Sequence, residues 1–144
     1  MQYSIFDGLE KEQIDSILPL MGHEVFDAGT EIIVEEGHND KIHFILEGHV
    51  IVVKNGTILM ELKKGAVFGE MEVLDVMPVE ATVKAIATTK VMTLSIAALG
   101  QLFDTDLAAF SFILMNLARD LSRRLRLMNI QIMDKDESPP TEWS

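Results

Sequence analysis

Apolar and polar residues follow three different patterns along this chain. Over residues 9–21, Ile14, Ile17 and Leu18 recur at helical spacing among charged residues, which predicts a short amphipathic helix ending near Pro19. Between residues 26 and 62, short β-branched runs are separated by glycines; the runs are Glu31–Glu35, Lys41–Leu46, His49–Lys54 and Thr57–Leu62. Closely spaced strands with glycine turns predict an antiparallel β-roll or barrel.

One hairpin can be predicted from its turn. Asn55 and Gly56 separate the strands at 49–54 and 57–62, and both residues tolerate the positive φ that a two-residue hairpin turn needs. These two strands should therefore pair. The remaining predicted elements are strands at Ala81–Ala87 and Lys90–Ile96, which would close the roll, and a short helix from about Ala97 to Phe103.

A long helix is predicted from Leu107 to about Met133. Its apolar positions alternate steps of three and four; they are Leu107, Phe110, Leu114, Leu117, Leu121, Leu125, Met128 and Ile132. Such a stripe packs against another helix and is longer than a small roll covers, so we expect a homodimer through residues 107–133. The alternative is that this helix lies across its own roll. Residues 134–144 are polar and contain two prolines, which predicts a disordered tail.

The stretch best suited to bind a ligand lies at residues 65–74. An apolar strand end is followed by a glycine-bracketed turn and an acidic helix start. Gly69 has no Cβ, so it permits positive φ and lets a ligand approach the main chain. Because the first amides of a helix lack internal partners, this turn is predicted to present backbone N–H groups to an anion.

This stretch and its continuation carry a resemblance to a known family. The landmarks, in order, are Phe68-Gly69-Glu70-Met71, Leu74, Pro78 and Ala81-Thr82-Val83. They resemble the phosphate-binding cassette of cyclic-nucleotide-binding domains, the family of the catabolite activator protein and the protein kinase A regulatory subunits. Spaced glycines upstream extend the likeness, which covers about residues 5–130. It implies a mainly β fold with flanking helices: an antiparallel double-stranded β-helix, or jelly-roll-like β-roll, with a short N-terminal and a long C-terminal helix, forming one domain over residues 1–133.

The resemblance also implies roles for individual residues. The backbone around Gly69 would hold the cyclic phosphate and Glu70 would bind the ribose 2′-hydroxyl. The other residues that the resemblance places at the nucleotide are Phe68, Met71, Ala81 and Thr82 in the cassette, and Met128 and Asn129 on the long helix, beside the base.

The sequence departs from the family pattern at one charged position. Val79 takes the place of the arginine that pairs with the phosphate, and Glu80 follows it. Loss of a charged hydrogen bond worth about 1.5–3 kcal/mol would weaken binding by about one to two orders of magnitude. A Glu80 carboxylate facing the same pocket would repel the phosphate further.

Three interpretations of function remain open. In the first, the chain is a regulatory module that binds cAMP or cGMP weakly and signals through its C-terminal helix, with Arg123, Arg124 or Arg126 compensating for Val79. In the second, the pocket admits a different, neutral or cationic small ligand. In the third, the domain is degenerate and serves dimerisation or contact with a protein partner, without nucleotide.

Charge and composition narrow the partners. The formal net charge of −11 opposes direct binding to DNA or to anionic membranes, although arginines cluster at residues 119–126. The N-terminus lacks the pattern of a leader and no apolar run is long enough to span a bilayer, so we expect a cytoplasmic protein. No helix-turn-helix domain follows the long helix, so we expect either a stand-alone sensor or a fragment of a longer protein. The chain has no cysteine, which excludes thiol chemistry.

A cupin-like enzyme is the remaining alternative of another class. His43 and His49 lie on predicted strands and would have to converge on a metal with an acid. The paired histidines with a following glutamate are missing, and no nucleophile elbow, P-loop or paired-carboxylate arrangement is present. We therefore expect neither a metal site nor catalysis.

Overall fold

The predicted strands and helices occur in the predicted order, with one additional strand. The computed structural model describes residues 4–75 and 77–135, with side chains over 5–75 and 77–129. The helical elements are η1 (Ser4–Phe6), α1 (Lys11–Ile17), η2 (Leu18–Leu20), α2 (Glu70–Asp75), α3 (Ile96–Thr105) and α4 (Leu107–Lys135). The strands are β1 (Gly22–Phe26), β2 (Glu31–Ile33), β3 (Lys41–Glu47), β4 (His49–Lys54), β5 (Thr57–Lys63), β6 (Val67–Phe68), β7 (Thr82–Ala85) and β8 (Thr89–Ser95).

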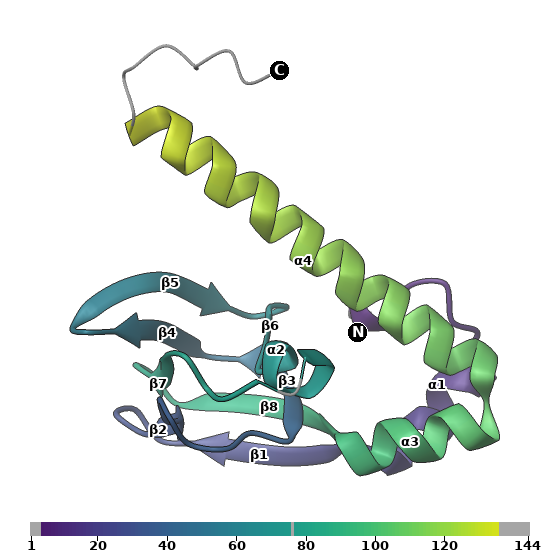
Figure 1. The fold of residues 1–144 in the computed structure, drawn as a ribbon. Helices are drawn as coiled ribbons and strands as arrows, with labels where there is room; N and C mark the ends of the chain where they lie inside the picture. The colour runs from purple at the N-terminus through teal and green to yellow at the C-terminus, as the bar shows by residue number, and fades with distance from the viewer. Residues whose placement is uncertain (1–3, 76, 136–144) are drawn as a thin grey trace.

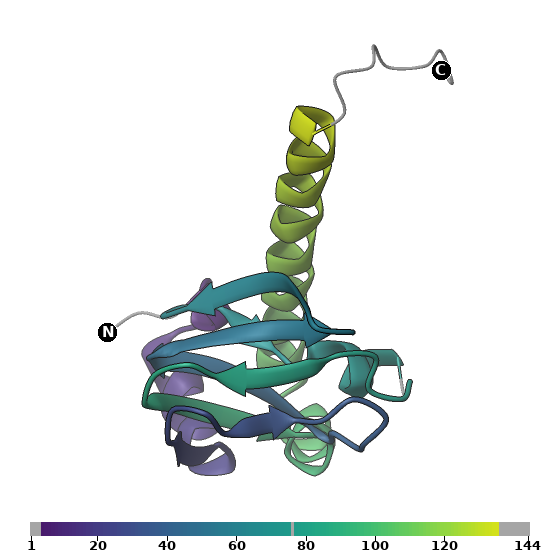
Figure 2. The same ribbon diagram turned by 90° about the vertical axis from the view of Figure 1, so that its left-hand side faces the viewer.

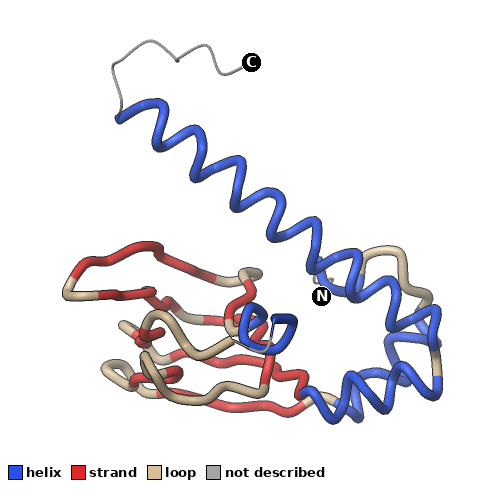
Figure 3. Tube along the Cα trace, viewed as in Figure 1, coloured by secondary structure: helices blue, strands red, loops and turns tan. Residues whose placement is uncertain are grey.

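The strands form two antiparallel sheets that enclose a β-roll (Figures 1 and 3). One sheet has the order β1-β8-β3-β6 and the other the order β2-β7-β4-β5. α1 and α3 gather at one end of the roll, and α4 leaves α3 to run back above the strands. The expected mainly β fold with flanking helices is confirmed.

The predicted hairpin forms, with a register shift between Val52 and Val53. Lys54 pairs with Thr57 across the turn, and Asn55 and Gly56 adopt φ values of 52° and 74°. These are the left-handed conformations that a type I′ turn requires, so this pairing follows from two residues of sequence.

Two apolar clusters hold the layers together. The first lies between the β1-β8-β3-β6 sheet and the helices; its fully buried members include Ile17, Ile42, Leu94, Leu102, Ile113 and Leu117. The second fills the interior of the roll and includes Ile33, Ile45, Val50, Phe68, Val79, Val83 and Val91. β3 contributes Ile42 to the first cluster and Ile45 to the second, so it is buried on both faces, which explains its nearly continuous apolar run.

β1 is a strand that the sequence analysis did not predict. It pairs along its whole length with β8, from Gly22 opposite Thr93 to Phe26 opposite Thr89. β1 is an edge strand with mostly exposed side chains, so it lacks the apolar alternation of a strand that covers a core.

The two halves of α4 have different surroundings. The first half packs on the domain, and buried Asn116 donates hydrogen bonds to the carbonyl oxygens of Ile5 (2.8 Å) and Asp7 (2.9 Å). The second half extends beyond the body of the roll (Figure 2), and its Arg124, Leu127 and Met128 line a groove beside β5. Within the described residues, no helix combines the length and the apolar character needed to cross a membrane.

The predicted apolar stripe of α4 is divided between these two environments. Leu117 is 1% exposed and, with Phe110, belongs to the domain's own core, whereas Leu107, Leu125 and Met128 are exposed. A packing role within the domain therefore replaces part of the predicted dimer seam. The side chain of Ile132 and residues 136–144 of the expected tail lie outside the described part of the chain, and α4 continues two residues past the predicted boundary.

Candidate functional site

The turn between β6 and α2 is built around Gly69. Its φ of 80° lies in the left-handed region. A Cβ at this position would lie 2.7 Å from Asn39 Nδ2 and 2.8 Å from the Lys41 carbonyl oxygen. Glycine is therefore required here both by conformation and by the close approach of neighbouring main chain.

Asn39 fixes this turn from a neighbouring loop. Its Nδ2 donates to the carbonyl oxygens of Gly69 (2.8 Å) and Lys41 (2.9 Å) and lies 3.2 Å from Glu72 Oε1. One side chain thus joins the β6–α2 turn to the start of β3 and holds an acidic side chain of α2. Sequence analysis did not single out Asn39, because its partners lie up to 33 residues away.

A cavity of about 290 Å³ opens beside the turn and is mostly apolar. It is lined by Val52, Lys54, Leu59, Met60, Leu62, Phe68, Gly69, Glu70, Met71, Glu72, Asp75, Met77, Pro78, Glu80, Ala81, Val83 and Arg124. The walls come from β4, β5, β7, the β6–α2 segment, the segment between α2 and β7, and α4. Four carboxylates and two cationic side chains line it, so the lining carries a formal charge of −2 when all six are ionised.

The strongest polar contact in the cavity joins α4 to α2. Arg124 Nη1 lies 2.9 Å from Glu70 Oε1, and Arg124 Nη2 lies 2.9 Å from Asp120 Oδ2 and also donates to the Val67 carbonyl oxygen. Glu70 is only 2% exposed. Its burial raises the pKa of the carboxyl group, and Arg124 opposes that rise.

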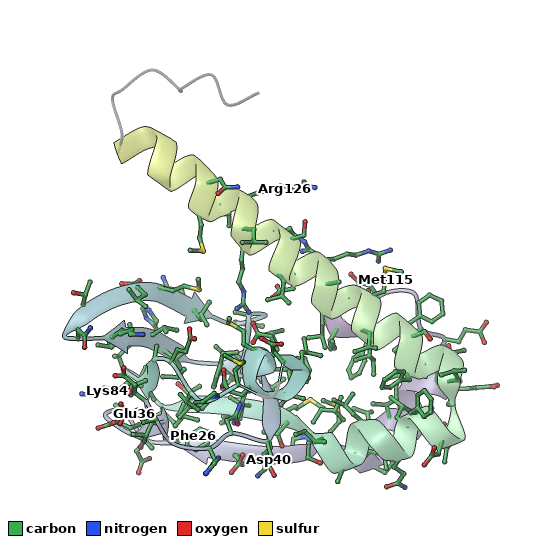
Figure 4. The ribbon with its side chains drawn as sticks, viewed as in Figure 1. Phe26, Glu36, Asp40, Lys84, Met115 and Arg126 are labelled. Atoms are coloured by element: carbon green, nitrogen blue, oxygen red, sulfur yellow. The ribbon has the colours of Figure 1, made fainter. Side chains whose placement is uncertain are left out.

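The other arginines of the cluster lie on different faces of α4. Arg119 and Arg123 are exposed, and Arg126 points away from the β-roll (Figure 4). Of the three arginines that the sequence offered as replacements for the absent one, only Arg124 lines the cavity.

The structure brings together most, but not all, of the predicted site residues. Those that line the cavity are Phe68, Gly69, Glu70, Met71, Glu80 and Ala81. Thr82 does not; its Oγ1 accepts a hydrogen bond from the Glu35 amide at 3.1 Å. Met128 lines a neighbouring groove between β5 and α4, and Asn129 is exposed and lines neither.

Val79 also lies outside the cavity wall. It is 4% exposed and packs in the interior of the roll, while Glu80 lines the cavity. The sequence analysis had placed both residues at the ligand. Burial of the apolar side chain explains why Val79 turns inward, since no charge holds it at a polar surface.

The sequence analysis missed several residues of the cavity. They are Val52, Lys54, Leu59, Met60, Leu62, Glu72, Asp75, Met77, Pro78 and Val83. Sequence alone would not have assembled this set. Val52 and Lys54 share one face of β4, but the two-residue turn predicts Leu59 opposite Val52, and Met60 takes that place only through a register shift between Val52 and Val53.

The two histidines considered for a metal do not converge. His43 on β3 stacks on Phe68 with ring centroids 4.6 Å apart, and His49 on β4 lies 3.4 Å from Glu61. Burial, together with Lys41, lowers the pKa of His43 to about 4. Among the described residues, no three histidine, aspartate or glutamate side chains are grouped so that they could hold a metal ion.

Comparisons with known proteins agree with this architecture. A cyclic nucleotide-binding domain model matches residues 23–106. The cAMP-dependent protein kinase regulatory subunit of Debaryomyces hansenii is 31% identical over 91 residues, which are 62% of this chain and 20% of that protein. The chain thus spans about a fifth of the length of this curated relative.

Solved structures share the fold over nearly the whole chain. A cyclic nucleotide-binding domain from Methylobacillus flagellatus KT superposes with a TM-score of 0.84 and 26% identity, covering 94% of this chain and 79% of that one. The catabolite activator protein of Thermus thermophilus gives a TM-score of 0.74 and 25% identity, covering 90% and 61%. This chain therefore belongs to the cyclic nucleotide-binding domain family.

Proposed function

We propose that this chain is a regulatory ligand-sensing module in which α4 responds to the occupancy of the cavity. The observation that carries this proposal is Arg124, a side chain of α4 that lines the cavity and pairs with the buried Glu70. A molecule that contacts Glu70 also contacts Arg124 of α4. Ligand binding would therefore shift the position of α4, and the position of α4 would change the affinity for the ligand by the same free energy. The role is regulatory rather than enzymatic, and we expect it to be exercised in the cytoplasm.

Cyclic nucleotides are the first candidate ligands, because the family and the kinase regulatory subunits among its relatives point to cAMP or cGMP. We infer that this chain binds them weakly. Val79 supplies no cation and lies in the core, and Glu80 adds a carboxylate to the cavity lining. Both features disfavour a phosphate anion relative to a family member that has the arginine.

The position of Val79 decides which variant can strengthen binding. Val79→Arg would place a guanidinium in the interior of the roll, where an unpaired charge is strongly unfavourable. Glu80 is exposed and lines the cavity, so Glu80→Gln removes the unfavourable charge without disturbing the core.

Isothermal titration calorimetry with cAMP and cGMP tests the proposal. We expect dissociation constants roughly ten- to hundred-fold above those of a family member that has the arginine. Glu80→Gln should tighten cAMP binding roughly two- to five-fold, the scale of a screened charge interaction, whereas Glu31→Gln, on β2 outside this cavity, should leave binding unchanged. Equal affinities for the wild type and Glu80→Gln would contradict the electrostatic part of the proposal.

A second candidate function is a dimerisation or protein-interaction module that binds no nucleotide. The observation in its favour is the exposed apolar surface on the second half of α4, where Leu125 is 61%, Leu127 60% and Met128 45% exposed. The same titrations separate the two functions. Absence of binding for both nucleotides, together with a dimer in sedimentation, would favour this second function over ligand sensing.

A further inference from the structure

The cavity is lined by a cation from α4, outside the segment that carries Gly69. Within the described residues, two cationic side chains line it: Lys54 from β4 and Arg124 from α4. Lys54 lies at the hairpin end of β4 and has no acidic partner among the described ion pairs. Arg124 instead lies against the segment that carries Gly69, through contacts to residues on both sides of that glycine.

The arginine is held in the cavity by groups that a ligand can replace. Arg124 contacts the Glu70 carboxylate, the Val67 carbonyl and the Asp120 carboxylate. Its fork of N–H donors suits the two oxygens of a carboxylate or a phosphate equally well. A ligand anion beside Gly69 would therefore compete with Glu70 for the same donors, while the contact to Asp120 within α4 would remain.

Proton uptake by Glu70 would offset part of the cost of giving up this contact. Burial disfavours its charged form and raises the pKa of the carboxyl group, so the group takes up a proton more readily once Arg124 is withdrawn. The neutral carboxyl group keeps the capacity to hydrogen-bond a ligand hydroxyl. Loss of the Glu70–Arg124 contact during binding is a cost, and it agrees with weak rather than tight binding of an anion.

We propose that Arg124 recognises the anionic group of the ligand in this cavity, in place of the arginine that is absent at position 79. This inference rests on the proposed function and adds to it the residue that recognises the ligand's charge. Because Arg124 belongs to α4, an anionic ligand would contact this helix directly.

The experiment compares one ligand that carries the anion with one that lacks it. Calorimetric titrations with cAMP and with adenosine give an affinity ratio, and adenosine serves as an internal measure of pocket integrity. We expect the wild type to prefer cAMP by about ten-fold or more, the contribution of a charged hydrogen bond. Arg124→Gln should reduce this ratio to about one while changing adenosine affinity by less than about three-fold.

Control variants separate Arg124 from other cations. Arg123→Gln, the exposed neighbour on the same helix, should leave the ratio unchanged, and Lys54→Gln should lower it less than Arg124→Gln does. Arg124→Lys should keep part of the preference. If Arg124→Gln does not fold, the comparison of Glu70→Gln with the double variant Glu70→Gln/Arg124→Gln measures the same ratio without an unpaired buried carboxylate.

Three results would overturn this inference alone. They are a preference for cAMP that persists in Arg124→Gln, a preference lost in Lys54→Gln but not in Arg124→Gln, and tighter binding of both ligands by Arg124→Gln, which would make Arg124 only an obstruction. If neither ligand binds the wild-type protein at low-millimolar concentration, this inference and nucleotide sensing both fail.

Discussion

Arg124→Gln is expected to lower the free energy of unfolding by about 3 kcal/mol at pH 7. The substitution leaves the Glu70 carboxylate, which is 2% exposed, without the cation that lies 2.9 Å away. Removing one partner of a buried pair costs about 3–5 kcal/mol, and the lower end applies because 19% of the Arg124 side chain is exposed and Glu70 can take up a proton. Urea denaturation followed by circular dichroism measures the change.

Two further variants test whether the buried pair is the cause. Arg123→Gln, on the exposed face of α4, should change the free energy of unfolding by less than about 0.5 kcal/mol. The double variant Glu70→Gln/Arg124→Gln should recover at least half of the stability lost by Arg124→Gln, since it leaves no uncompensated charge. A single variant as stable as Arg123→Gln, or a double variant no more stable than Arg124→Gln, would contradict this assignment.

His43 should make the protein less stable in mild acid. Lowering the pH from 7 to 5 is expected to reduce the free energy of unfolding by about 2 kcal/mol through this residue. Burial and the neighbouring Lys41 lower the pKa of folded His43 to about 4, against the opposing effect of Asp40, whereas the unfolded chain takes up this proton near pH 6.5. The stabilisation is therefore complete above about pH 6.5 and is lost as the pH falls toward 4.

Comparison with a non-titrating variant isolates this contribution. His43→Gln stays neutral at every pH, so the loss between pH 7 and pH 5 should be about 2 kcal/mol smaller in this variant than in the wild type. The raised pKa of Glu70 acts in the opposite direction, favouring the folded state as the pH falls, and cancels because both proteins contain it. If the free energy of unfolding falls by the same amount between pH 7 and pH 5 in the wild type and in His43→Gln, the assignment is wrong.

Local turn chemistry made much of the roll predictable from sequence. Asn55-Gly56 determined one hairpin, and Gly69 marked the turn beside the cavity, because a positive φ restricts the residue type directly. β1 escaped prediction for the opposite reason. Its side chains are largely exposed, so no apolar pattern records its pairing with β8.

The orientation of α4 was harder to predict, because part of its apolar stripe packs in the domain core and part is exposed. The sequence analysis assigned the whole stripe to a partner helix, so it did not predict which side of α4 faces the domain. In the structure that side carries Ile113, Leu117, Asp120 and Arg124, spaced by four, three and four residues. A charged pair that continues a core-packing face is a signal that sequence analysis can use, and it would have singled out Arg124 from its neighbours.

A motif match gives the position of a residue but not the direction of its side chain, as Val79 shows. The resemblance identified the position of the family's arginine, and the sequence analysis assumed that Val79 faces the ligand as that arginine does. An apolar side chain gains by entering the roll interior, and Val79 is 4% exposed there. The residues of the motif that line the cavity are then Glu80, Ala81 and those around Gly69.

Hydrogen exchange of α4 tests most directly whether this helix responds to the cavity. Saturating cAMP should slow exchange of backbone amides at residues 120–128 more than at residues 109–117, which the domain's own core already anchors. Protection of the pocket segments α2 and β7 in the same experiment reports binding itself. If those segments become protected while residues 120–128 exchange at an unchanged rate, the ligand binds without engaging α4 and the proposed coupling is wrong.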